Sequence, residues 1–328
     1  MLGGLARRVS HVMKVRAEQQ PVLVVDSGDL FSPYPAALDA EKAQKKARLL
    51  GQAYRRMAVG AVNVGCLDLI QGLDLLRQEY SQGLPLVSAN LLDPSTKTAI
   101  FPPYAIREVA ELRVAFFGLL SPELGPEISP AVRRVNEGKI LIGDPVKAAG
   151  EVVQKLKERA DLFILLSDMG LARDQEVARA VPGIHFILGG HEGRFTGRAH
   201  RSEKTFILQS SAKGMNVGHL RLTLKNIGLP FMDAGESLYL QEKISFIDSR
   251  LQGLKATRES QSAKDTDLDR WIQNLNRQRS TLQEELKKSR QTIPQRNRFL
   301  FTTVPMEMTL PEDEEVKKRI AEMAIEKD

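Results

Sequence analysis

Acidic and imidazole side chains follow several apolar runs of this sequence, where they could bind a cation or carry protons. Asp29 comes shortly after the β-branched run Pro21 to Asp26, Asp168 ends the run that starts at Leu162, and His191 follows two glycines after another run. Such runs predict buried strands, and sites in α/β sheets form at the carboxyl ends of strands. We therefore expect Asp29, Asp168 and His191 to converge at one sheet edge.

Each of these residues also has a purely structural interpretation. Asp29 could cap a turn, and Asp168 could end a strand or cap a helix. Asn63 could be a turn residue, and Cys66 could be a small buried hydrophobe, although a redox role stays open for it. His191 is favoured as a site residue, because the preceding glycines let the backbone approach a ligand. The other histidines (His11, His185, His200 and His219) are interpreted as structural or surface residues.

The composition describes a chain with a full apolar core and one cysteine. It has 328 residues, 42% hydrophobic and 27% charged, which is enough for one large domain and an appendage. The single cysteine excludes an internal disulfide framework. We find no apolar run long enough to span a membrane and no apolar stretch typical of a signal peptide near Met1.

Strand and helix patterns alternate over the first 230 residues or so and predict an α/β sandwich. Strands are expected at 21–26, 58–64, 84–89, 113–119, 162–167, 184–188, 205–209 and 217–224, and helices at 39–56, 72–80, 145–159 and 174–181.

The order of the motifs resembles a known family. GGLARR, VVDSGDLF, AVNVGCLDLIQG, VSANL, VAFFGLLSP, DLFILLSDMG, IHFILGGHEGR and ILQSSAKGMNVGHLRLTL follow one another between residues 3 and 224. This series is similar to the N-terminal domain of 5'-nucleotidases and UDP-sugar hydrolases, which are calcineurin-like metallophosphoesterases. The resemblance implies a four-layer α/β sandwich, a divalent metal site for Mn, Zn or Mg, and a phosphate-ester ligand.

The metal-binding motifs of that family are only partly present here. Its GD motif corresponds to Gly28 and Asp29, and Asp29 would be the bridging carboxylate. Asp168 stands in place of the LLSH histidine, and His191 keeps the first histidine of GHxH. Gly193 replaces the second. The GNHE region contains no histidine, and Asn63 is the residue there that could retain an amide ligand.

These departures make the predicted site, Asp29, Asn63, Asp168 and His191, an incomplete one. The family's DxH strand has no counterpart before Gly3, which could reflect only where this sequence begins. The changes at 63–66, Asp168 and Gly193 are interior, so they are divergence. Because loss of ligands usually defeats two-metal hydrolysis, the resemblance predicts weak or lost activity.

Beyond Leu224 the pattern becomes helical. Apolar residues recur at three- and four-residue spacing in two series, from Leu240 to Leu254 and from Leu268 to Ile293, which predicts an antiparallel hairpin. A strand is expected in 298–310 and a helix over Glu312 to Ile325. The expected domains are 1–236 (metallophosphoesterase-like), 237–293 (helical hairpin) and 294–328 (returning strand and terminal helix).

Two functions follow from these observations. One is a phosphoesterase with an altered or single-metal site. The alternative is a non-catalytic scaffold or docking protein of the cell envelope, partnered with a redox protein. Residues 241–300 carry 13 basic and 8 acidic residues, an excess of five that suits an acidic protein partner at the hairpin. Few aromatic residues accompany that charge, which disfavours nucleic acid. The resemblance implies a periplasmic location, with the cytoplasm as the alternative.

Overall fold

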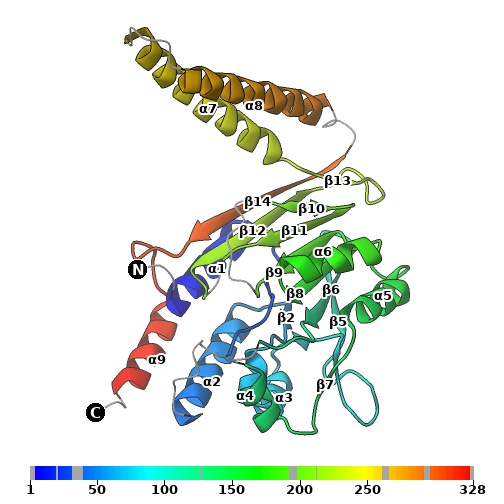
Figure 1. Cartoon of the computed structure of the whole chain (residues 1–328). Coiled ribbons are helices and arrows are strands. Elements are labelled where there is room, and N and C mark those ends of the chain that lie inside the picture. The colour runs from blue at the N-terminus through cyan, green and yellow to red at the C-terminus, as the bar shows by residue number, and fades with distance from the viewer. Residues whose placement is uncertain are drawn as a thin grey trace. The chain divides into compact units, whose positions relative to one another are not determined.

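The chain forms two compact units. The computed structural model describes residues 4–19, 21–31, 40–125, 128–191, 198–211, 213–260, 266–291 and 296–325 (Figure 1). One unit is Met1–His219 with Thr302–Asp328, and the other is Leu220–Phe301. None of the described helices is both long and apolar enough to cross a membrane.

A small parallel sheet and its helices form one half of the first unit. The sheet has the order β1-β2-β3, with β1 at Val25–Asp26, β2 at Ala61–Asn63 and β3 at Leu86–Val87. Helices α1 (Leu5–Glu18), α2 (Ala40–Arg56) and α3 (Leu73–Ser81) pack with it. Their buried apolar faces, which include Val9, Ala53 and Leu76, form one core cluster with Val62 and Val64.

A six-stranded sheet forms the other half, in the order β10-β11-β9-β8-β6-β5. The strands are β5 (Tyr104–Val109), β6 (Leu112–Leu120), β8 (Leu162–Asp168), β9 (Phe186–Gly189), β10 (His200–Ser202) and β11 (Thr205–Gln209). Strands β6, β8, β9 and β11 run parallel, and the two edge strands are antiparallel. Alternate residues of β6 (Ala115, Phe117 and Leu119) join one core cluster with α5 (Pro145–Leu156) and α6 (Leu171–Ala180).

The two sheets face each other, since β2 contacts both β6 and β8. The layers are therefore helices, sheet, sheet, helices, which confirms the predicted four-layer α/β sandwich. Short elements complete it: β4 (Leu91–Leu92), β7 (Leu141–Ile142), α4 (Ser129–Val135) and the 3-10 turn η1 (Asp68–Gln71). Helix α9 (Glu314–Ile325) also belongs to this unit and contacts α1 and α2.

A three-stranded sheet lies at the division between the units, which falls inside two of its strands. Its order is β12-β14-β13, with β12 at Asn216–Thr223, β13 at Phe231–Asp233 and β14 at Asn297–Pro305. The strand expected within 298–310 is β14, and it is the middle strand of this sheet. The fully buried Asn297 side chain fixes its start through hydrogen bonds to the backbone of Lys225, Asn226 and Leu229.

Helices α7 (Glu236–Ser260) and α8 (Thr266–Gln291) form the predicted hairpin (Figure 1). Apolar residues of both helices fill the seam between them: Ile247, Leu251, Leu254, Leu268, Ile272, Leu275 and Leu282. Ion pairs join Asp248 to Arg279 at 2.6 Å and Arg258 to Asp269 at 3.0 Å. The earlier residue of α7 thus pairs with the later residue of α8, so the helices run antiparallel. The domain boundaries expected at 236 and 293 lie close to the ends of this hairpin and stay a prediction.

Candidate metal centre

The site begins where β1 ends in a tight, left-handed turn. Gly28 and Asp29 have φ angles of 111° and 59°, a conformation open to glycine and tolerated by aspartate. The Gly28 backbone N–H donates to Asp26 Oδ1 at 2.9 Å, which fixes the turn. The turn brings the Asp29 carboxylate back to the end of β2, where the Leu67 N–H donates to its Oδ1 at 2.7 Å.

Asp68 ties this turn to the loop after β2. Its carboxylate accepts three backbone N–H groups, from Phe31 at 2.7 Å, Gly65 at 2.8 Å and Asp29 at 3.0 Å. The side chain is only 1% exposed. The two loops approach so closely that a methyl group on Gly65 would lie 2.3 Å from Asp29 Oδ1. Glycine at 65 is therefore required for Asp29 to sit where it does.

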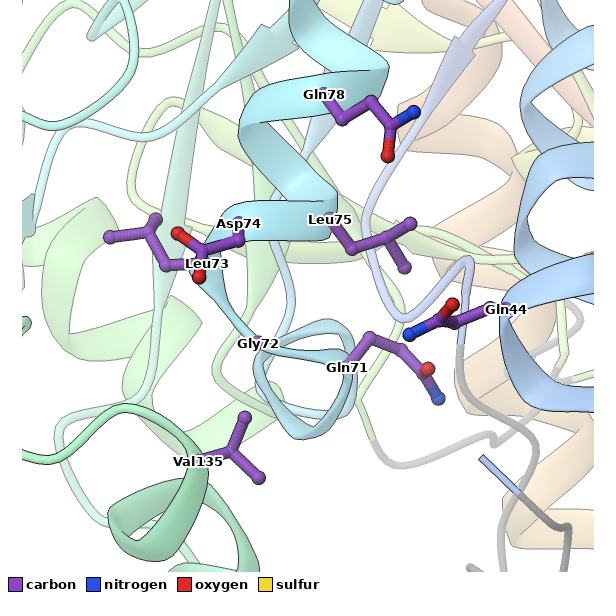
Figure 2. A pocket seen from close by; sticks show the side chains of 8 residues that line it. All are labelled: Gln44, Gln71, Gly72, Leu73, Asp74, Leu75, Gln78 and Val135. Carbon is purple, nitrogen blue, oxygen red and sulfur yellow. The ribbon is translucent and has the colours of Figure 1, made fainter. Parts of the chain in front are cut away.

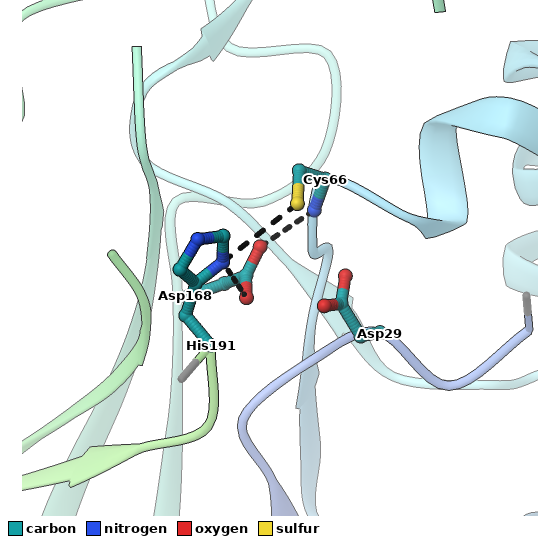
Figure 3. A group of neighbouring side chains, drawn as sticks. All are labelled: Asp29, Cys66, Asp168 and His191. Carbon is teal, nitrogen blue, oxygen red and sulfur yellow. Dashed lines mark hydrogen bonds and ion pairs between the residues drawn. The ribbon is translucent and has the colours of Figure 1, made fainter. Parts of the chain in front are cut away.

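Four side chains meet at these strand ends: Asp29, Cys66, Asp168 and His191 (Figure 3). One potential ligand atom from each lies within 4.8 Å of all the others. His191 Nδ1 is 3.1 Å from Asp168 Oδ1 and 3.8 Å from Cys66 Sγ, and the Cys66 N–H donates to Asp168 Oδ2 at 2.6 Å. The expected convergence of Asp29, Asp168 and His191 is confirmed. Gly193 lies outside the described residues.

Asn63, the fourth residue of the predicted site, is anchored by its side-chain amide at the end of β2. It is fully buried in β2, and its amide N–H groups donate to the carbonyls of Ser27 at 3.0 Å and Leu119 at 2.9 Å. Its Oδ1 packs against Gly118 of β6 and has no hydrogen-bond partner. Asn63 thus braces the Asp29 turn against the second sheet. Cys66, three residues later, has its sulfur within the group. It was not among the candidate ligands predicted from the sequence.

Several acidic groups crowd this buried place. Burial raises the pKa of Asp29 well above its usual range, and the nearby carboxylates of Asp168 and Asp68 raise it further. Burial likewise raises the pKa of Asp68 to about 7, against the lowering effect of its backbone N–H donors. Burial and the carboxylates of Asp168 and Asp29 also raise the pKa of the Cys66 thiol. A bound cation would relieve this repulsion.

The donor set fits a divalent cation. Thiolate, imidazole and carboxylate are the ligands that zinc takes in proteins, usually four in number. At Zn–S of about 2.3 Å and Zn–N of about 2.05 Å, a tetrahedral angle puts the two ligand atoms about 3.6 Å apart. The observed Cys66 Sγ to His191 Nδ1 distance is 3.8 Å. His191 is 31% exposed, whereas Asp168 is 1% exposed, so the group is open on its histidine side.

Three of the other histidines make contacts that agree with a structural interpretation. His185 Nδ1 accepts the Phe163 N–H at 3.1 Å and its ring stacks on Phe163. His11 of α1 and His219 of β12 meet through their Nε2 atoms at 2.8 Å. These contacts lie on other elements than the metal-site loops.

A separate hollow of about 290 Å³ lies at the start of α3 (Figure 2). It is lined by Gln44, Gln71, Gly72, Leu73, Asp74, Leu75, Gln78 and Val135. None of the four residues of the metal centre is among them, so this hollow is no part of that site.

The fold and the strand-end site agree with the similarity of this chain to known phosphoesterases. No family model matches the chain. It is 26% identical over 212 residues to a 2',3'-cyclic-nucleotide 2'-phosphodiesterase/3'-nucleotidase of Salmonella typhimurium, covering 57% of this chain and 32% of that protein. It is 25% identical over 285 residues to the snake venom 5'-nucleotidase of Crotalus adamanteus, covering 74% and 44%.

A solved structure shows the same fold along almost the whole chain. The 5'-nucleotidase precursor of Thermus thermophilus matches with a TM-score of 0.65 at 19% identity, covering 99% of this chain and 53% of that one. The chain thus spans a third to a half of the length of these relatives. The resemblance is confirmed: the chain is similar in sequence to 5'-nucleotidase-type phosphoesterases and shares the fold of a solved 5'-nucleotidase precursor.

The close approach at Gly65 makes a first prediction. Gly65→Ala should weaken Zn²⁺ binding by about tenfold or more, because the new methyl group displaces Asp29. Gly150→Ala is the matched control, since a methyl group there meets nothing within 4 Å and the residue lies inside α5. The control should keep wild-type affinity in a competitive chelator titration. Equal affinities for all three proteins would contradict the assigned geometry.

The raised pKa values make a second prediction. Protons on Asp29 and Cys66 must leave before both can bind a cation, and their raised pKa values move that loss to higher pH. Affinity for Zn²⁺ should therefore rise from pH 6 to pH 8, by up to about tenfold per pH unit for each proton released. Asp29→Asn should bind more weakly with a shallower pH dependence. An affinity that is flat over this range would refute the assignment.

Proposed function

We propose that this chain is a metal-dependent phosphoric ester hydrolase that acts on nucleotide-type esters through one cation. The observation that carries the proposal is the convergence of Asp29, Cys66, Asp168 and His191 at the strand ends of a 5'-nucleotidase-type domain. The relatives named as nucleotidases support the substrate class. Asp29, Asp168, His191 and Cys66 would hold the cation, and Asn63 would brace the Asp29 turn.

The residues of the site provide two carboxylates, Asp29 and Asp168, and one solvent-exposed side at His191. When bound, the cation would activate a water and neutralise phosphoryl oxygens. Asp29 and Asp168 supply negative charge beneath it, and the exposed His191 marks the side from which an ester can approach. The loop 63–68 contains no histidine that could protonate a leaving group. Hydrolysis is therefore expected to be slow.

An activity assay tests this proposal. Protein loaded with Zn²⁺ or Mn²⁺ should hydrolyse bis-p-nitrophenyl phosphate and nucleotides slowly, barely above background, and Asp29→Ala should abolish the reaction. Asp74→Ala is the matched control, because Asp74 lies on α3 with its side chain 82% exposed. Equal hydrolysis by Asp29→Ala and wild type would contradict the proposal of a metal-dependent hydrolase. Turnover at ordinary phosphatase rates would contradict hydrolysis through a single cation.

We propose in addition that the α7–α8 hairpin binds an acidic protein segment. Its large apolar side chains Leu238, Phe246 and Trp271 are 58%, 63% and 45% exposed, and the Arg250 guanidinium lies 4.7 Å from the Trp271 ring centre. Exposed aromatic and arginine side chains are typical anchors of protein interfaces. The net positive charge of this segment favours an acidic ligand.

Trp271 is the only tryptophan, so its fluorescence reports on this surface directly. Titration with polyglutamate should change the emission, and added salt should weaken the binding, because exposed charges are screened. Arg250→Glu should weaken binding more than Arg298→Glu, an exposed charge-matched control on β14. Equal effects of the two variants, or binding that ignores salt, would contradict this proposal.

The periplasmic location implied by the resemblance is likewise a proposal. Its support is limited to export from the cytoplasm, since one relative is named a snake venom 5'-nucleotidase. Fractionation of cells of the source organism with an antibody to this protein would test it, and recovery in the cytoplasmic fraction would refute it.

A further inference from the structure

Cys66 has the surroundings of a metal ligand rather than of a core residue alone. It is 1% exposed and belongs to the apolar core cluster of the first unit, as buried cysteines commonly do. Yet its sulfur also lies 3.8 Å from His191 Nδ1 and within 4.8 Å of carboxylate oxygens of Asp29 and Asp168. A side chain with a purely apolar role would be unfavourable next to three polar groups in a buried place.

We infer that Cys66 binds the cation as a thiolate and that the site is a mononuclear one selective for Zn²⁺ over Mn²⁺ and Mg²⁺. When the S–Zn bond forms, the S–H bond breaks and the proton leaves to solvent, with no change of oxidation state. The inference uses the cation site of the proposed function, but it does not depend on hydrolysis.

The backbone around Cys66 holds its sulfur and one carboxylate in a fixed relation. The Cys66 N–H donates to Asp168 Oδ2, while Asp168 Oδ1 is 3.1 Å from His191 Nδ1. At bond lengths of about 2.0 to 2.1 Å, tetrahedral oxygen and nitrogen ligands lie about 3.3 Å apart. The observed distances of 3.1 and 3.8 Å therefore need only small adjustments to close around one zinc ion.

The neighbouring carboxylates are engaged elsewhere, which limits the site to one cation among the described residues. Both oxygens of Asp68 accept backbone N–H groups. Those of Asp26 accept the Gly28 N–H and the Tyr54 hydroxyl, the latter at 2.7 Å. A second cation would have to displace these hydrogen bonds.

The donor types decide the selectivity. Mg²⁺ and Mn²⁺ favour oxygen ligands and six-fold coordination, whereas thiolate sulfur with imidazole in a four-ligand site favours Zn²⁺. Replacing the sulfur by a hydroxyl oxygen should remove that preference. The Zn²⁺ over Mn²⁺ affinity ratio should then fall by about tenfold or more in Cys66→Ser.

Cobalt spectroscopy tests the inference without any activity measurement. Co²⁺ replaces Zn²⁺ with similar geometry and absorbs light, and Cys66 is the only cysteine, so any thiolate-to-cobalt charge-transfer band comes from it. The full chain, freed of metal, should show this near-ultraviolet band together with strong visible bands of four-coordinate Co²⁺, saturating at one equivalent. Zn²⁺ should displace the cobalt stoichiometrically, and excess Mn²⁺ should not.

Cys66→Ser and Cys66→Ala should lose the charge-transfer band while keeping the wild-type circular dichroism spectrum. If neither variant folds, the wild-type titration still decides. A wild-type spectrum with only weak visible bands and no charge-transfer band, or saturation at two equivalents, overturns the inference. These outcomes can be told apart from those of the hydrolysis assay. A charge-transfer band without hydrolysis contradicts only the hydrolase proposal. Hydrolysis without a charge-transfer band contradicts only the proposal that Cys66 binds the cation as a thiolate.

Discussion

The hydrogen bonds of one buried carboxylate, Asp68, hold the candidate metal centre together. They join the turn after β1 to the loop after β2, because three backbone N–H groups from these two segments converge on the same side chain. Hydrogen bonds to a charged acceptor are stronger than neutral ones, and leaving such donors unpaired in the interior is costly. Together with the Leu67 N–H bond to Asp29, this link holds the loops of Asp29 and Cys66 side by side.

The same link places several carboxylates close together, and a bound cation would reduce the repulsion between them. It draws Asp29 toward Asp168 and adds its own charge nearby, so burial and neighbouring carboxylates both disfavour the ionised form of Asp29. Asn63 fixes the arrangement from the other side by holding the Ser27 carbonyl against β6. The second unit contributes none of the four side chains of the centre. The chemistry proposed for this chain therefore depends on the first unit.

Much of this arrangement could be predicted from the sequence, because apolar runs show where strands end. That reasoning correctly brought Asp29, Asp168 and His191 together. It did not place Cys66 in this group, since only the backbone path after β2 brings the Cys66 side chain beside the other three. It also missed α1, whose buried face (Ala6, Val9 and Val12) is interrupted by arginines. It predicted the strand β14 but not its neighbours, which come from distant parts of the chain. Long-range pairing leaves little trace in a single sequence.

The central claim is that Asp29, Cys66, Asp168 and His191 form one cation site. An anomalous difference map at the zinc edge, from crystals of the full chain grown with Zn²⁺, tests it most directly. We predict one strong peak at the strand ends, about 2.3 Å from Cys66 Sγ and about 2.0 to 2.2 Å from the His191 nitrogen and the two carboxylates. No peak at this position, or two peaks flanking Asp29 with Cys66 outside bonding distance, would contradict the account.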